Sequence, residues 1–269
     1  MKYYLNNPLA NNGIRVELPG VELIDASALD YAEFFRGLKE EDEVVLIGGD
    51  GTINYLINHV DCENLKNNVY LYGNGSGNDF LNDIGEKPGR EILLNPYLKN
   101  LPVARVNGRE IRYINNMSYG IDGYCCEIAD KIKAKTPGKK INYTSIAIKG
   151  VLYDFKPCSA DVTVDGVTRH FDNIWLAPAM KGRYCGGGMK LAPGQDRFSD
   201  KLTVMIYCCR SRLSTLMAFP KIFEGRHVEM TDRTTVITGN RVHVKFSRPC
   251  AAQIDGETVL NVSEYWAEL

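Results

Sequence analysis

The hydrophobic pattern of residues 1–100 is typical of an α/β layer. Short apolar runs alternate with polar turns, and the run Val44 to Ile47 is uniformly apolar, as expected of a strand buried on both faces of a parallel sheet. Residues Ser27 to Lys39 repeat apolar positions at helical spacing, which predicts an amphipathic helix. The other strands predicted in this part are Tyr3 to Leu5, Val21 to Asp25 and Val69 to Tyr72.

Beyond residue 100 the pattern changes to short alternating segments separated by tight turns. The pairs Asn107-Gly108 and Asp165-Gly166 each lie between two such segments, and these pairs are strong hairpin signals. Helical patterns around residues 124–135 and 143–153 interrupt the alternation. We therefore predict a Rossmann-like α/β domain over residues 1–100 and a larger antiparallel β-sandwich-type domain over residues 101–269.

The turn after the most apolar strand carries the first candidate chemistry. Here Gly48-Gly49-Asp50-Gly51-Thr52 leads directly into a helical pattern, with Thr52 as the predicted N-cap. Such a turn brings backbone N–H groups and the positive end of a helix to one point, which suits a phosphate group. A carboxylate at position 50 would repel bound phosphates unless a cation or a transferable proton lay between them. The turn therefore indicates phosphoryl transfer more than passive nucleotide binding.

Two more polar loops follow predicted strands of the same domain. Asn7 follows the first strand, and Gly75-Ser76-Gly77-Asn78-Asp79 follows the strand that ends at Tyr72. In a parallel, right-handed α/β sheet the loops after successive strands emerge at the same edge. The three loops are thus expected to line one crevice, which predicts a nucleotide site.

Taken in order, these motifs resemble the diacylglycerol kinase catalytic-domain family, which includes soluble bacterial lipid kinases and sphingosine kinases. The resemblance extends over nearly the whole chain, because the late hairpin sequence Asp255-Gly256-Glu257 also matches the family. It implies an ATP-dependent lipid kinase that requires Mg²⁺ and acts on a hydroxyl of diacylglycerol or a similar amphiphile. The active site would lie in the cleft between the two domains, and a triple glycine at 186–188 is expected to form a bend or a close approach near it.

The resemblance also implies roles for individual residues. Glu257 would accept the proton of the lipid hydroxyl, with Asp255 close by, and Asp50 has a catalytic role in the sphingosine kinase branch. Asp50 and Asp79 are expected to help hold the Mg²⁺ that enters with ATP, and Asp200 with the Leu202 carbonyl is expected to bind a structural Mg²⁺. The implied nucleotide-binding residues are Asn7, Gly48, Gly49, Asp50, Gly51, Thr52, Asn54, Ser76 and Asn78.

Two departures from the family pattern keep other functions open. Relatives often carry Asp-Asp-Gly before a Leu-rich strand, whereas this chain has Asp200-Lys201-Leu202, which puts a lysine beside the expected cation. An Asp that is common near Pro102 in relatives is absent. One alternative is therefore a catalytically impaired nucleotide- or lipid-binding relative. The other is an NAD kinase-like enzyme, which shares the GGDG turn, although a segment of the Gly-Thr-Pro-Thr-Gly-Ser-Thr type does not occur here.

Composition limits the partners that we expect. A formal net charge of −1 over 269 residues gives no general attraction to nucleic acid or to anionic membranes. No apolar run has the length of a signal peptide or a membrane span, so we expect a cytoplasmic protein that meets its lipid by transient contact with a membrane surface. A basic cluster at 131–140 could meet anionic headgroups or form a solvated surface. The eight cysteines lack CxxC spacing and are interpreted as reduced thiols, and a homodimer is one option for assembly.

Overall fold

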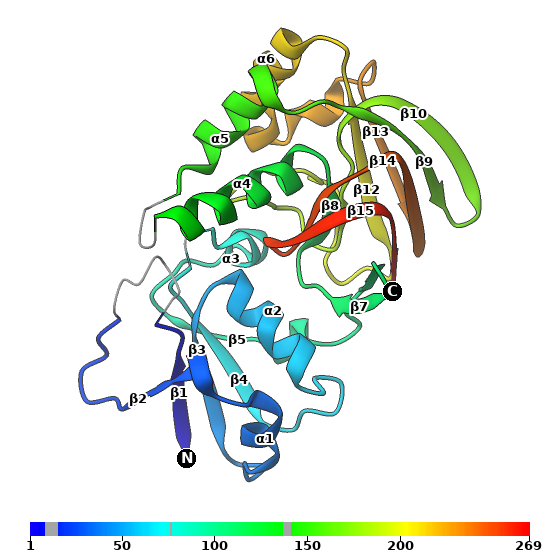
Figure 1. Cartoon of the computed structure of the whole chain (residues 1–269). Coiled ribbons are helices and arrows are strands. Elements are labelled where there is room, and N and C mark those ends of the chain that lie inside the picture. Colours follow the sequence, from blue (N-terminus) through cyan, green and yellow to red (C-terminus); the bar gives the residue numbers. More distant parts are fainter. Residues whose placement is uncertain (9–15, 76, 137–140) are drawn as a thin grey trace.

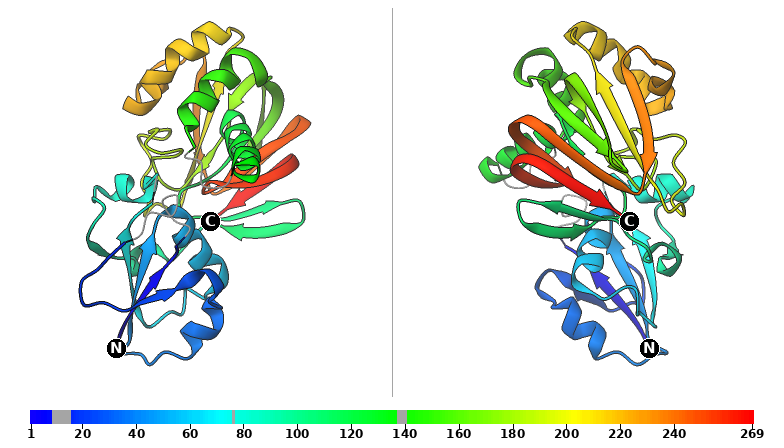
Figure 2. Two further views of the ribbon diagram at one scale, coloured as in Figure 1. Left: turned by 60° about the vertical axis from the view of Figure 1, so that its left-hand side comes forward. Right: turned by 90° about the vertical axis from the view of Figure 1, so that its right-hand side faces the viewer.

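The structure is a computed structural model of the chain, and it describes residues 1–8, 16–75, 77–136 and 141–269 (Figure 1). An N-terminal α/β domain and a β-rich domain lie one above the other, and Figure 2 shows that the C-terminus ends at the junction between them. The predicted fold class is confirmed. Within the described ranges, no helix is long and apolar enough to cross a membrane.

The first sheet explains why the predicted loops converge. Its strand order is β2-β1-β3-β4-β5, with all neighbours parallel except β4 and β5. Because β1, β3 and β4 are parallel, the segments that follow them leave the sheet at the same edge. The strands are β1 (Lys2–Asn6), β2 (Leu23–Asp25), β3 (Glu43–Gly48), β4 (Asn68–Gly73) and β5 (Glu91–Leu93).

The helices of this domain pack apolar faces on the sheet. Residues 27–39, predicted as one helix, form two short ones, because Asp30 accepts a hydrogen bond from the Glu33 amide and starts a new helix there. The prediction of Thr52 as an N-cap is wrong, since α2 already begins at Asp50 and Gly49 is its N-cap. The elements are η2 (Ala26–Ala28), α1 (Tyr31–Arg36), α2 (Asp50–His59), α3 (Asp79–Ile84) and η3 (Asn95–Tyr97).

The second sheet is antiparallel throughout and folds back on itself, because β14 pairs with β8 on one side and also with β9. This closure encloses a core of aliphatic and aromatic side chains that includes Tyr119, Val162 and Tyr265. Its strands are β6 (Val103–Val106), β7 (Arg109–Arg112), β8 (Asn116–Tyr119), β9 (Cys158–Val164), β10 (Val167–Leu176), β11 (Ala179–Met180), β12 (Leu202–Cys208), β13 (Thr234–Gly239), β14 (Arg241–Ile254) and β15 (Glu257–Glu268).

The helices of the β-rich domain gather on one side of it, at the upper left of Figure 1. The two helical patterns expected around 124–135 and 143–153 are confirmed, whereas α6 was not predicted. The described strands of the first sheet lie within residues 2–93 and those of the second within 103–268, and the boundary at residue 100 stays a prediction. The helices are α4 (Ile121–Lys135), α5 (Tyr143–Lys149), the π-helical turn η4 (Gly150–Asp154), α6 (Arg212–Glu224) and η5 (Arg226–Glu229).

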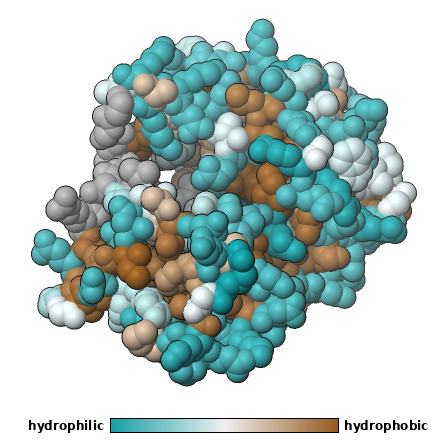
Figure 3. All heavy atoms as spheres, turned by 60° about the horizontal axis from the view of Figure 1, so that its bottom comes forward, coloured by the Kyte–Doolittle hydropathy of each residue, from teal (hydrophilic) through white to brown (hydrophobic). Residues whose placement is uncertain are grey.

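The surface does not reveal the site by hydropathy alone. Figure 3 views the molecule with the α/β domain forward, and hydrophilic side chains cover most of this face, with apolar side chains gathered in patches between them. The contacts between individual residues, and not the surface hydropathy, define the site.

Candidate functional site

The two glycine turns of the α/β domain touch each other through their backbones. The Asn74 amide donates to the Gly48 carbonyl at 2.7 Å. A Cβ atom placed on Gly49 would lie 2.6 Å from the Cα of Gly75, and one on Gly48 would overlap the side chain of Thr52. Glycine is required here because the two turns approach more closely than any side chain allows.

Asp50 connects the two turns. Its carboxylate accepts hydrogen bonds from the backbone amides of Asp79 and Phe80, both at 2.9 Å, and from Nδ2 of Asn115 at 3.1 Å. The first two donors lie at the start of α3, where a negative charge is electrostatically favoured. Asp50 thus fixes the second turn against the first and reaches Asn115 of the β-rich domain, just before β8. Its predicted catalytic role stays a prediction.

Asp79 brings the triple glycine of the β-rich domain to the same place. Its buried carboxylate accepts from the amides of Gly187 at 2.9 Å and Gly188 at 2.7 Å. Burial and the charge of Asp50 raise the pKa of Asp79 to about 7, although the two hydrogen bonds act in the opposite direction. Residues 186–188 therefore form the close approach that the sequence predicted, and Asp79 holds them over the glycine turns.

Asp255 anchors the carboxylate hairpin. It is buried at the turn between β14 and β15, where it has φ +47° and Gly256 has φ +92°. Its carboxylate accepts from the amides of three consecutive residues, 114–116, at 2.7 to 3.0 Å, and from Nδ2 of Asn54 at 2.9 Å. Burial raises the pKa of Asp255 to about 6 in spite of these hydrogen bonds. Because four donors occupy it, Asp255 positions the hairpin against α2.

Glu257, two residues further on, is exposed at the start of β15. Its Oε1 would lie 3.8 Å from a Cβ atom placed on Gly51, so the hairpin and the first glycine turn share one site. The pKa of Lys133 in α4 is lowered by burial but raised overall by neighbouring charges, among them that of Glu257. Of the three acids predicted to be catalytic, Glu257 is the one that lies exposed at the mouth of the site.

Several residues predicted to bind nucleotide have other contacts. Nδ2 of Asn54 donates to Asp255 and to the Arg112 carbonyl, which links the two domains. Asn78 has φ +50° and donates from Nδ2 to the Gly75 carbonyl at 2.8 Å, which stabilises its own turn. The Asn7 amide donates to the Ile47 carbonyl at 3.4 Å, and Ser76 lies outside the described residues. Their roles toward a nucleotide stay predictions.

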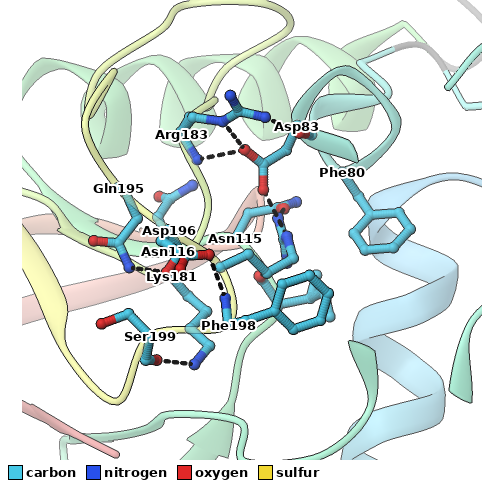
Figure 4. Close-up of polar contacts among 12 residues, drawn as sticks. Phe80, Asp83, Asn115, Asn116, Lys181, Arg183, Gln195, Asp196, Phe198 and Ser199 are labelled. Atoms are coloured by element: carbon cyan, nitrogen blue, oxygen red, sulfur yellow. Dashed lines mark hydrogen bonds and ion pairs between the residues drawn. The ribbon is translucent and has the colours of Figure 1, made fainter. Parts of the chain in front are cut away.

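The segment expected to bind a structural Mg²⁺ surrounds a lysine instead (Figure 4). Lys181 is 3 % exposed, and its Nζ donates to the Ser199 carbonyl at 3.0 Å. Burial and Arg197 lower the pKa of Lys181 to about 8, whereas Asp196 and Asp200 act to raise it. A divalent cation held by Asp200 and the Leu202 carbonyl would be repelled by the positive charges of Lys181 and Arg197. In the part of the chain that the structure describes, no three His, Cys, Asp or Glu side chains are grouped to hold a metal. These residues do not fit the expected cation.

The structure also reveals a clamp between the domains that the sequence did not predict. Asp83 of α3 accepts from the Arg183 amide at 3.0 Å, from Arg183 Nε at 2.7 Å and from Arg197 Nε at 2.6 Å. Arg197 also donates to the Ile114 carbonyl at 2.6 Å and to Oδ1 of Asn115 at 2.9 Å. Since Nδ2 of Asn115 donates to Asp50, the clamp continues into the glycine turns. The sequence signal was the unusual segment around Arg197, which lacks the acidic pair of the family.

The class of protein is a two-domain α/β and β-sandwich fold, in which paired glycine turns of the first domain meet a carboxylate hairpin of the second. The Diacylglycerol kinase catalytic domain profile matches residues 6–99, and the YegS C-terminal NAD kinase beta sandwich-like domain profile matches residues 115–265. The chain therefore belongs to the diacylglycerol kinase catalytic-domain family, as its motifs predicted.

Individual relatives agree with this assignment. The chain is 24% identical over 264 residues to a diacylglycerol kinase of Mycobacterium tuberculosis (strain CDC 1551 / Oshkosh), covering 90% of this chain and 84% of the relative. It is 25% identical over 229 residues to a diacylglycerol kinase of Bacillus subtilis (strain 168), covering 82% and 72%. A crystal structure of a diacylglycerol kinase from Bacillus anthracis str. Sterne superposes with a TM-score of 0.67 at 18% identity, over 99% of this chain and 93% of that one, and shows the same fold.

Proposed function

We propose that this protein is an ATP-dependent lipid kinase that transfers the γ-phosphoryl group to a hydroxyl of diacylglycerol or a similar amphiphile. Family membership and the names of the relatives support a lipid kinase in general. The observation that carries the finer proposal is the exposed carboxylate of Glu257 beside Gly51, at the N-terminus of α2. This arrangement places a proton acceptor next to a turn suited to phosphate.

The phosphate-binding part of the proposal rests on backbone groups. The amides of Asp50 and Gly51 precede the first hydrogen bond of α2, which the Thr52 amide makes to the Gly49 carbonyl, and the surrounding glycines allow a close approach of phosphate oxygens. Mg²⁺ bound with ATP would neutralise the charge of the polyphosphate, and carboxylate oxygens are present at this turn in Asp50, the first residue of α2, and in Glu257 beside Gly51.

The roles of the acids follow from their contacts. Glu257 orients the acceptor hydroxyl and takes its proton as the phosphoryl group is transferred. Asp255 is a positioning residue, because its carboxylate is fully engaged by the amides at 114–116 and by Asn54. Asp50 and Asp79 hold the three glycine segments together, so they shape the pocket in which phosphate would lie. A cytoplasmic protein in peripheral contact with a membrane is part of the same proposal.

The experiment is a transfer assay with purified protein, labelled ATP, Mg²⁺ and a panel of lipids, with NAD as a parallel acceptor. Label in the chloroform phase supports the proposal, whereas label in NADP indicates an NAD kinase-like enzyme. Nucleotide binding without transfer to any acceptor indicates an impaired relative. These three outcomes separate the functions that the sequence left open.

A single substitution then tests the assigned proton acceptor. Glu257→Gln should lower turnover by roughly 100- to 10,000-fold, the usual contribution of a general base. Its melting temperature should not change, because the side chain is exposed. Glu41→Gln is the matched control, since Glu41 is exposed just before β3 begins, at the edge of the sheet opposite the glycine turns. Turnover within about tenfold of the parent protein would remove Glu257 from this role.

A further inference from the structure

Helix α6 carries apolar side chains around its whole circumference. Thr215, Ala218 and Ile222 are buried on the side that faces the β-rich domain, where Ala218 and Ile222 pack against the core. On the opposite side Leu213 is 64% exposed and Met217 is 71% exposed. Surface helices normally present polar residues to water, so the outer side of α6 has the composition of a contact surface.

The exposed apolar surface continues onto the neighbouring turn η4. The guanidinium of Arg212, at the start of α6, donates to the carbonyls of Val151 at 2.6 Å and Phe155 at 2.9 Å. Tyr153 lies in the turn between these two carbonyls and is 72% exposed. The turn η4 follows α5 directly in the chain and packs against α6. We call this surface the α6 face, formed by the exposed side chains of Ile148, Tyr153, Leu213, Met217 and Phe223.

Cations outnumber acids around the α6 face. Residues 141–156 and 208–224 contain five Lys or Arg side chains and two acids, Asp154 and Glu224, although the whole chain has a net charge of −1. The five basic residues are Lys149, Lys156, Arg210, Arg212 and Lys221. Exposed apolar side chains flanked by cations complement an anionic lipid surface, in which the former enter the headgroup region and the latter meet phosphates.

We propose that the α6 face docks on an anionic bilayer surface. This docking inference rests on the proposed function, because a lipid kinase must reach a substrate that resides in a bilayer. No described helix can span a bilayer. Docking of a second copy of this chain through the same face is disfavoured. A two-fold interface would bring the excess of cations on one copy close to the same excess on the other, at a cost in like-charge repulsion.

Vesicle co-sedimentation tests the proposal. The probes are phosphatidylcholine vesicles with and without phosphatidylglycerol, and the variant is Met217→Glu. The matched control is Val167→Glu, since Val167 is 62% exposed at the hairpin turn between β9 and β10, away from α6 (Figure 1). Met217→Glu should weaken binding to anionic vesicles about tenfold or more, as expected when one large apolar side chain no longer enters the interface. Val167→Glu should bind like the parent protein, and both variants should keep its melting temperature because both sites are exposed.

A charge variant provides an independent measurement. The double change Arg210→Gln with Lys221→Gln should weaken binding to anionic vesicles by about tenfold and reduce its salt dependence, without affecting binding to neutral vesicles. Equal binding of the Met217→Glu and Val167→Glu proteins would overturn the proposal. So would a dimer in solution that Met217→Glu converts to a monomer, or a parent protein that does not bind anionic vesicles.

The kinase assay distinguishes failure of this inference from failure of the proposed function. With a short-chain, water-soluble diacylglycerol, Met217→Glu should retain the activity of the parent protein, whereas with vesicle-borne substrate it should lose activity in proportion to binding. If the parent protein binds vesicles through the α6 face but phosphorylates neither substrate, the docking inference stands and the kinase proposal falls. If Met217→Glu is equally active on both substrates, the docking inference falls and the kinase proposal stands.

Discussion

The interdomain clamp leads to a quantitative prediction for Asp83→Asn. The side chain of Asp83 is 2% exposed and that of Arg197 is 6% exposed, so neither charge can be compensated by water if its partner is removed. Breaking a buried ion pair by changing one partner typically costs about 3–5 kcal/mol. Asp83 accepts three hydrogen bonds from two arginines, so we expect a loss at the upper part of this range. Small domains have a total stability of about 5–15 kcal/mol, so the loss would be a large fraction of it.

Urea unfolding is the appropriate assay, because two probes can separate the domains. Both tryptophans, Trp175 and Trp266, lie in the β-rich domain, so their fluorescence reports on that domain, whereas circular dichroism reports on both. Loss of the clamp should make the two transitions diverge as well as lowering their midpoints. The control is Glu40→Gln, which removes an exposed pair with Lys66 and should change the free energy of unfolding by at most about 1 kcal/mol.

Two results would refute this reasoning. A loss below about 1 kcal/mol for Asp83→Asn would mean that the buried arginines find other partners without cost. Transitions that remain superimposed would mean that other contacts, such as that between Asn54 and Asp255, couple the domains by themselves. Replacing the pair together, by Asp83→Leu with Arg197→Met, should recover part of the loss, because no unpaired charge remains buried between these two positions.

Further predictions concern other parts of the site. The folded pKa of Asp79 is raised from 3.8 to about 7, so the unfolded chain releases this proton first, and the free energy of unfolding should fall as the pH rises between these values. Asp79→Asn should flatten that slope in urea titrations at several pH values. Gly49→Ala forces a Cβ against Gly75 and should cost about 1–3 kcal/mol, whereas Gly51→Ala has 3.8 Å of space within α2 and should raise stability by up to about 1 kcal/mol. EDTA should leave the melting temperature unchanged, because Lys181 stands where a structural cation was expected, and a fall would contradict this.

The α/β domain could be predicted from the sequence because its signals are local. The uniform apolar run at 44–47 and the glycines after it indicate a buried strand and a close turn without reference to the rest of the chain. The start of α2 was misplaced by three residues, since Thr52 looks like an N-cap in the sequence while Gly49 is the N-cap in the structure. The long strands β14 and β15 were missed as elements, because their irregular register disturbs the alternation on which strand prediction depends.

The sequence predicted which segments come together, but not which contacts their side chains make. Asp255 and Glu257 look equivalent in the sequence, as two carboxylates around one glycine. The structure separates them, because the donors that occupy Asp255 come from residues about 140 positions away and are invisible to local patterns. Asp255 is buried in the turn and Glu257 is exposed at the start of β15, which gives two acids of one motif different tasks.

One of the two departures that raised doubt about activity, the altered metal segment, has a physical explanation. A metal segment without its acidic pair would leave backbone carbonyls and Asp200 with no cation, and Lys181 provides that positive charge from within the chain. Arg197, in the same segment, extends a guanidinium to Asp83 and Asn115 and so to Asp50. A positively charged side chain costs the entropy of ordering it, but unlike a bound metal ion it does not depend on the metal concentration. The glycine turns can therefore be held in place without a structural ion, and the altered segment is no argument against catalysis.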